Sequence, residues 1–206
     1  MINIPHKIKK FVSMFFLSSG LIFIADGATF ASYKGLRLNP AKVIQPQTLT
    51  NHNGEQISFP SANGKYKLVF FGYTSCPDVC PTTLIKIKQV IKALESDERV
   101  QYNFISIDVE RDKPELLKSF VGFYHPKITG ITGNIHNIKA VEKEFGILTR
   151  KFQGKSALAY KLEHTVFLYL IDPKGELILM YPGSTNATQI VADLKILLEK
   201  PKDALH

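Results

Sequence analysis

Cys76 and Cys80 are the residues of this chain best suited to chemistry, and they are its only cysteines. An apolar run at 68–71 precedes them, and apolar residues at helical spacing follow from Leu84 to Leu94. The pair is therefore expected where a strand passes into a helix, with the two sulfurs a few ångströms apart. Two such thiols can form a disulfide, relay electrons or hold a soft metal ion. The positive end of the helix dipole favours the thiolate that all three roles need.

The composition supports a functional pair better than a structural one. With 206 residues, 45% of them hydrophobic, the chain can build one full core without disulfide staples. Two cysteines four positions apart are too local to act as a scaffold. The net charge of +8 is compatible with nucleic acid or an anionic membrane. However, the lysines are spread along the chain without interleaved aromatic residues, so we expect no nucleic-acid partner.

The N-terminal segment has the layout of a membrane-targeting signal. Lys7, Lys9 and Lys10 precede an apolar run at 11–25. We expect residues 1–31 to form an uncleaved anchor in a bacterial inner membrane, with cleavage near 25–31 as the alternative. The basic flank then keeps the N-terminus cytoplasmic and places the rest of the chain in the periplasm. Residues 32–45 are predicted to be a linker and residues 46–206 the folded domain.

Strand and helix patterns alternate through this domain. The turn Asn51-His52-Asn53-Gly54 predicts a β-hairpin at 48–59, and residues 148–162 are expected to be an extended loop or a second hairpin. Asp112 is expected to cap a helix that ends at His125. The remaining predicted strands are 67–73, 100–109, 165–171 and 176–181, and the remaining helices are 81–94, 137–145 and 186–199.

This alternation predicts an α/β fold, with a central mixed sheet flanked by helices on both faces. A dithiol at the end of the first long core strand resembles the arrangement in the thioredoxin fold. The fold class is therefore a thioredoxin-like sandwich with an added N-terminal β-hairpin.

The spacing of the cysteines favours a metal over simple redox chemistry. C-x-x-x-C is one residue wider than the redox C-x-x-C pair, which relaxes the geometry toward holding one ion between two sulfurs. Thiolates select soft ions such as Cu(I), and a neutral imidazole can complete the site, whereas two cysteines leave zinc short of its usual four ligands. His164, at the entrance to the strand 165–171, is the favoured third ligand, with His125 and His136 as alternatives.

Four segments together resemble the Sco/SenC family. They are Phe71-Gly-Tyr-Thr-Ser-Cys-Pro-Asp-Val-Cys-Pro-Thr-Thr-Leu84, Ser106-Ile-Asp-Val-Glu-Arg-Asp-Lys-Pro114, Ile131-Thr-Gly133 and Glu163-His-Thr165, the last followed by a strand to Asp172-Pro-Lys-Gly175. The similarity covers roughly residues 45–198, and the single N-terminal anchor is also typical of the family.

The resemblance implies a membrane-anchored copper metallochaperone with a thioredoxin-like fold. Its ligands would be Cys76, Cys80 and His164, holding one copper ion per chain, as Cu(I). It would receive copper from an upstream periplasmic donor and deliver it to the CuA site of cytochrome c oxidase subunit II. The alternative is a thiol–disulfide oxidoreductase that reduces the CuA-site cysteines, which would need Cys76 and Cys80 but not His164. Only the alternative would make the protein an enzyme.

Three carboxylates are predicted to support the site. Asp78, between the cysteines, is expected to cap the helix or to dock a partner. Asp108 ends a strand near the motif. Glu163, where the family typically has Asp, is expected to orient the imidazole of His164. Met180 is soft enough for copper, but its strand context favours the core.

Overall fold

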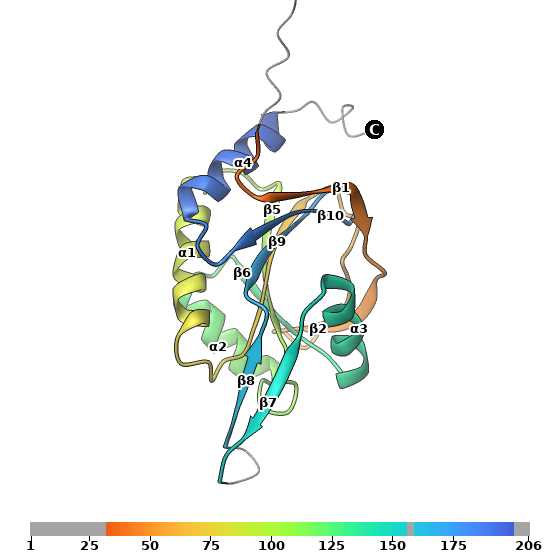
Figure 1. The fold of residues 1–206 in the computed structure, drawn as a ribbon, viewed down its shortest axis with the longest axis vertical. Coiled ribbons are helices and arrows are strands. Elements are labelled where there is room, and N and C mark those ends of the chain that lie inside the picture. The colour runs from red at the N-terminus through yellow and green to blue at the C-terminus, as the bar shows by residue number, and fades with distance from the viewer. Residues whose placement is uncertain (1–31, 156–158, 200–206) are drawn as a thin grey trace, which may run out of the picture. The chain divides into compact units, whose positions relative to one another are not determined.

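The computed structural model describes residues 32–155 and 159–199, so the predicted anchor at 1–31 lies outside the described residues. The described residues form an eight-stranded mixed sheet in the order β1-β10-β9-β4-β5-β6-β2-β3, and a separate two-stranded sheet, β7-β8 (Figure 1). β5 runs parallel to both β4 and β6, and the other pairings in both sheets are antiparallel. Within these residues, no helix is long and apolar enough to cross a membrane.

The elements follow the predicted alternation closely. The strands are β1 Leu36–Val43, β2 Gln47–Asn51, β3 Gln56–Phe59, β4 Tyr66–Gly72, β5 Val100–Ser106, β6 Ile128–Thr132, β7 Thr149–Gln153, β8 Tyr160–His164, β9 Phe167–Ile171 and β10 Glu176–Pro182. The helices are α1 Val79–Ala93, α2 Pro114–Tyr124, α3 Ile135–Phe145 and α4 Ala187–Glu199.

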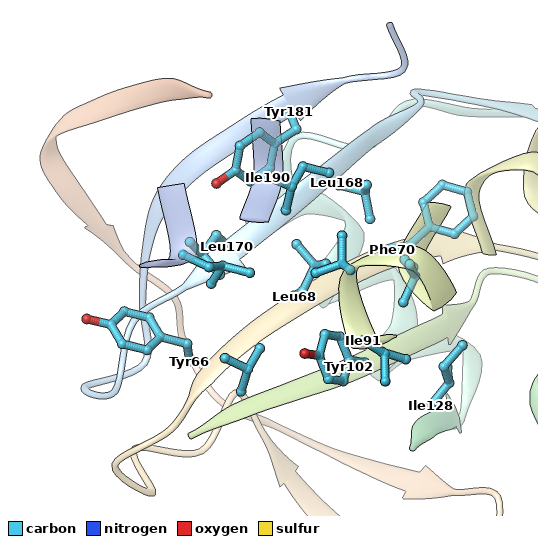
Figure 2. Packing of buried hydrophobic residues seen from close by; sticks show 14 of the residues in the cluster. Tyr66, Leu68, Phe70, Ile91, Tyr102, Ile128, Leu168, Leu170, Tyr181 and Ile190 are labelled. Atoms are coloured by element: carbon cyan, nitrogen blue, oxygen red, sulfur yellow. The ribbon is translucent and has the colours of Figure 1, made fainter. Parts of the chain in front are cut away.

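β4 separates two hydrophobic cores because its side chains alternate between the two faces of the sheet. Leu68 and Phe70 join the core that contains the buried faces of α1, α2 and α4. Val69 and Phe71 join the core that α3 covers. Figure 2 shows Leu68 and Phe70 among side chains from α1, α4, β5 and β9. A strand that is buried on both faces has a nearly continuous run of apolar residues. This run is why β4 could be predicted from the sequence.

The fold is the predicted thioredoxin-like sandwich. The expected N-terminal hairpin is β2–β3, which joins the edge of the main sheet through β6. The sequence allowed either an extended loop or a second hairpin at 148–162. The structure has a hairpin there, formed by β7 and β8. β6 was not predicted. It has only five residues, Gly130 interrupts it, and a strand this short carries little periodic signal.

The prediction that residues 32–45 are a linker was wrong. Most of this segment is β1, which pairs antiparallel with β10 at the edge of the sheet. Most of its side chains are exposed, and its register shifts between Arg37 and Lys42, around Pro40. Charges, proline and bulges are typical of edge strands. They also remove the apolar alternation by which the strand would have been recognised.

A buried carboxylate holds the start of β1 to α4. Asp193 is fully buried and accepts hydrogen bonds from the backbone N–H of Lys34, at 2.8 and 3.0 Å, and of Gly35, at 2.9 Å. Position 35 requires glycine because a Cβ there would lie 2.6 Å from the ring of Tyr181. The contact joins residues that are 158 and 159 positions apart, so it ties the start of β1 to the C-terminal helix.

We predict that Asp193→Asn destabilises the protein by about 1–3 kcal/mol, because an amide offers one acceptor oxygen where the carboxylate offers two. Urea denaturation measures the loss, and hydrogen exchange is expected to quicken first at the amides of β1. The control is Glu98→Gln, which removes a charge from an exposed ion pair with Lys127 and should change stability by less than about 0.5 kcal/mol. Equal effects of the two variants would contradict the role given to Asp193.

Candidate metal centre

The two cysteines lie where β4 passes into α1, as predicted. β4 ends at Gly72, a turn follows, and α1 begins at Val79. Cys80 lies in the first turn of the helix and is fully buried, whereas Cys76 in the preceding turn is half-buried. Both are free thiols. The Cys76 side chain is therefore partly accessible to solvent, whereas the Cys80 side chain is not.

Hydrogen bonds make the two thiols unequal. The pKa of Cys76 is lowered to about 5, first by the hydrogen bond from the Cys80 thiol, and further by the backbone N–H groups of Asp78 and Cys80 and the charge of His164. The pKa of Cys80 is raised because its proton is held by Cys76 and because it is buried. At neutral pH the pair is thus one thiolate and one thiol, at the positive end of a helix.

Gly72 leaves room for the buried sulfur. A Cβ at this position would lie 2.7 Å from Cys80 Sγ and 2.9 Å from the ring of Phe104. Both neighbours are fully buried and so have little space to move away. The glycine is needed for this close approach, not for an unusual backbone angle.

Asp112 supports the cysteine turn from beneath, which corrects the prediction that it caps α2. Its fully buried carboxylate accepts hydrogen bonds from Thr74 N at 2.9 Å, Thr74 Oγ1 at 2.6 Å and Ser106 Oγ at 2.7 Å. Burial raises the pKa of Asp112, and these hydrogen bonds oppose the rise. The residue at the N-cap of α2 is Lys113, and no side chain caps that end of the helix. The sequence did not indicate this role because Thr74, which makes two of the three hydrogen bonds, is 38 residues away in the chain.

His164 lies at the end of β8, beside the cysteine turn. Its ring centroid is 6.4 Å from that of Phe70 and 6.3 Å from that of Tyr73, edge-on to the latter. Its Nδ1 is 2.9 Å from the carbonyl oxygen of Thr165. Donation from Nδ1 to that carbonyl leaves the lone pair on Nε2, which is the form of imidazole that binds a metal.

Tyr73 joins the cysteine turn to the strand that carries His164. Its carbonyl oxygen accepts a hydrogen bond from Cys76 N at 3.2 Å, and its hydroxyl oxygen accepts one from Leu162 N at 3.4 Å. Burial is the main cause of its raised pKa. One residue therefore contacts both the cysteine turn and the strand that carries His164.

Asp108 supports the site indirectly, through an arginine. It accepts hydrogen bonds from Arg111 Nε and from the Tyr160 hydroxyl, each at 2.5 Å. The Arg111 guanidinium lies 3.7 Å from the ring centroid of Tyr160 and donates to the carbonyl oxygen of that residue at 3.1 Å. Tyr160 begins β8, so this contact set anchors the hairpin that ends at His164. Arg111 was not singled out in the sequence, although it lies in the segment 106–114.

Asp78 does not take the predicted capping role and Glu163 does not take the predicted role beside His164, while docking of a partner by Asp78 stays a prediction. Asp78 is the N-cap residue of α1, but its side chain makes no capping hydrogen bond and only its backbone N–H reaches Cys76. Glu163 is exposed, whereas Leu162 is buried and His164 half-buried. Alternation along β8 places Glu163 on the opposite face from His164, and the imidazole Nδ1 is oriented by the carbonyl oxygen of Thr165 instead.

The other candidate donors have structural surroundings of their own. His125 Nδ1 accepts a hydrogen bond from Lys127 N at 3.1 Å, His136 is exposed on α3, and Met180 packs against the core that α3 covers. Among the residues that the structure describes, no three His, Cys, Asp or Glu side chains converge closely enough to hold a metal ion as they stand.

The family model described as SCO1/SenC matches residues 37–199. This chain belongs to the SCO1/SenC family. A relative in Rickettsia typhi, a "SCO2-like protein", is 36% identical over 156 residues, covering 75% of this chain and 77% of that protein. The match to the family model begins at residue 37, within β1. This agrees with the finding that β1 is a strand of the sheet and not part of a linker.

Solved structures of family members have the same fold. ScoI of Bradyrhizobium japonicum with copper bound matches with a TM-score of 0.69 and 35% identity, covering 75% of this chain and 98% of that one. Apo Sco1 of Thermus thermophilus matches with a TM-score of 0.73 and 32% identity over 82% and 99% of the two chains. A third match, BsSco, has a TM-score of 0.63 and 26% identity over 80% and 96%. Its structure is described as showing a disulfide switch in a member of the Sco family of cytochrome c oxidase assembly proteins.

We predict that alkylation of Cys76 by iodoacetamide follows a midpoint near pH 5, fast above it and slow below, because the thiolate is the nucleophile. Cys80→Ala removes the main cause of the low pKa, so its midpoint should move upward toward the ordinary value for a thiol. Cys80→Ser keeps a hydrogen-bond donor and should stay closer to the unaltered protein. Mass spectrometry locates the adduct. A midpoint near pH 8–9 in the unaltered protein would contradict this account.

We predict that Gly72→Ala destabilises the reduced protein by about 1–3 kcal/mol, because the added methyl group overlaps Cys80 Sγ and Phe104. Urea denaturation measures the change. Gly122→Ala in α2 is the matched control, since a Cβ there meets nothing within 4 Å. It should be neutral or stabilising by up to about 1 kcal/mol. A Gly72→Ala variant as stable as the control would show that the turn adapts freely.

Proposed function

We propose that this protein is a copper metallochaperone of cytochrome c oxidase assembly. It binds one Cu(I) through Cys76, Cys80 and His164 and delivers it to the CuA site of subunit II. The observation that carries the proposal is a thiolate–thiol pair at the start of α1 with a histidine beside it. This donor set comes from two segments of the chain that Tyr73 joins.

The donor chemistry fits copper in its reduced state. Two sulfurs and one imidazole nitrogen are the soft and intermediate donors that Cu(I) prefers. One thiolate is already formed at neutral pH, and the second requires Cys80 to lose the proton that it shares with Cys76. Metal binding therefore releases a proton from this pair. ScoI of Bradyrhizobium japonicum and yeast Sco1 are both known with copper bound, which supports the assignment.

His164 is the ligand that controls loading and release. Since three donors do not converge among the described residues, copper binding through all three requires the imidazole to approach the sulfurs. Cys80 lies in the first turn of α1 and Cys76 in the loop directly before it, so the two sulfurs lie on one short stretch of chain, whereas His164 lies at the end of a separate two-stranded sheet. Release by ligand exchange would then begin with displacement of His164, as thiolates of the partner take over the ion.

The setting follows from the N-terminal segment. Residues 1–31 would anchor the chain in the inner membrane, with the domain facing the periplasm, where an upstream donor supplies copper. BsSco is described as a member of a family of cytochrome c oxidase assembly proteins, which supports the oxidase as the recipient, and we propose its subunit II.

The test is copper stoichiometry and X-ray absorption on the reduced full chain. We expect one Cu per chain with two sulfur neighbours and one nitrogen. His164→Ala should lose the nitrogen and weaken Cu(I) binding by more than roughly tenfold, since even changes behind a metal ligand cost about 10–100-fold. His136→Ala, on the exposed face of α3, is the matched control and should leave both readouts unchanged.

Two results would reject the chaperone. If copper binds with the same neighbours in His164→Ala, the ligand set is wrong. If the reduced chain retains no copper, and both it and His164→Ala exchange disulfides normally, the thiol–disulfide oxidoreductase is the better function. In that case Cys76 and Cys80 become a disulfide as the disulfide of the partner becomes two thiols.

A further inference from the structure

Among the described strands, β7 and β8 do not belong to the main sheet, and the hairpin that they form extends beyond it (Figure 1). It ends at His164 and leads into β9. We propose that this hairpin is a docking arm that recognises an acidic surface on the protein that receives the metal. The proposal rests on the proposed function and names the chemistry of its partner.

Basic residues dominate the hairpin. Its described residues include Arg150, Lys151, Lys155 and Lys161, against the single acid Glu163. The side chains of Arg150, Lys155 and Lys161 are exposed and add nothing to the core, so their charge is available for a partner.

The two faces of the hairpin differ in what they contact. Cross-strand pairs share a face, so Arg150 and Glu163 lie on the same face as Phe152 and Lys161. All four side chains are exposed, and Arg150 lies 4.5 Å from the ring centroid of Phe152. We call these four residues the outer face.

The opposite face packs on the body of the domain. Tyr160 and Leu162 are buried there. Lys151 belongs to this face, since its Nζ lies 3.0 Å from Glu110 and 3.8 Å from the ring centroid of Tyr160. The charge of Lys151 thus supports the hairpin itself, whereas Arg150 and Lys161 face solvent.

An open groove connects the outer face to the candidate metal ligand. Its lining comprises Leu148, Thr149, Arg150, Glu163, His164 and Thr165. Leu148 is 79% exposed, the second most exposed large hydrophobic side chain among the described residues. A second groove continues from Leu148 along α3 to Lys139 and Lys143. An apolar centre with an arginine beside it and a charged rim is the usual composition of a protein interface.

Charge complementarity identifies the occupant as an acidic protein surface. A partner that rests on Leu148 and Arg150 also lies against His164, which is the ligand that must be displaced for the metal to leave. Anionic lipid would satisfy the same cations, but a lipid surface supplies no metal-binding group to that groove. The protein partner is therefore favoured, and the lipid is an outcome of the test.

The test compares two charge reversals of equal size in the full chain. Arg150→Glu/Lys161→Glu alters the outer face, and Lys88→Glu/Lys92→Glu alters the exposed face of α1. Each is loaded with Cu(I) and mixed with the reduced, copper-free CuA domain of subunit II from the same organism. We expect the hairpin variant to transfer copper at least roughly tenfold more slowly at low salt and with a weaker salt dependence, and the α1 variant to stay within about twofold of the unaltered chain. Copper neighbours in X-ray absorption should be unchanged in both.

A second pair of variants tests the apolar contact. Leu148→Ala should weaken association with the CuA domain, measured by titration calorimetry, while leaving stability nearly unchanged because the side chain is exposed. Leu116→Ala in α2, an exposed leucine outside the groove, is its control and should leave association unchanged.

Several results would overturn the docking arm. Equal slowing by both charge reversals would show that only net charge matters, and no slowing by the hairpin variant would remove its role. Loss of binding to phosphatidylglycerol vesicles by the hairpin variant, with normal copper transfer, would assign the arm to lipid.

If the unaltered chain binds no copper, the proposed function fails separately. Titration of the copper-free chain with the CuA domain then decides the docking arm: association lost in the hairpin variant alone supports it, and association absent or unaffected rejects it.

Discussion

The pairing of the Cys80 thiol with the Cys76 sulfur is the interaction on which the chemistry of this protein depends. It is the largest cause of the low pKa of Cys76 and of the raised pKa of Cys80, so one bond creates a nucleophilic thiolate and a protected thiol. That geometry requires a buried sulfur in the first turn of α1, and the buried sulfur in turn requires a glycine at the end of β4. Asp112 then holds the intervening turn through Thr74.

The histidine is held by a different set of contacts, and this separation matters for function. Asp108, Arg111 and Tyr160 anchor one end of β8, and His164 is at the other. Tyr73 is the link between the two halves of the site. As the proposed third ligand, His164 is carried by a supporting element of its own, separate from the helix α1 that holds Cys80. Such an arrangement suits a protein that must both bind a metal ion and give it up.

A pair of thiols with one low pKa also suits disulfide chemistry, and the structure of BsSco is described in terms of a disulfide switch. The two chemistries share the same atoms because both begin with a thiolate. They differ in the need for His164 and in the need for a partner that reaches it. Membership of the SCO1/SenC family, together with the histidine beside the sulfurs, is why we place metal transfer first.

The sequence by itself determined the local features of this protein. The C-x-x-x-C pair at a strand–helix junction, the Asn-Gly turn of the β2–β3 hairpin and the doubly buried strand β4 all rest on short-range patterns, and each was predicted. The motif resemblance likewise led to the correct family. Only the tertiary structure decided that β1 is an edge strand, that Asp112 supports the cysteine turn rather than a helix end, and that Glu163 faces away from His164. The physical reason is common to all three: an edge pairing, a buried carboxylate and the face of a strand are defined by partners distant in the sequence, and no local pattern encodes them.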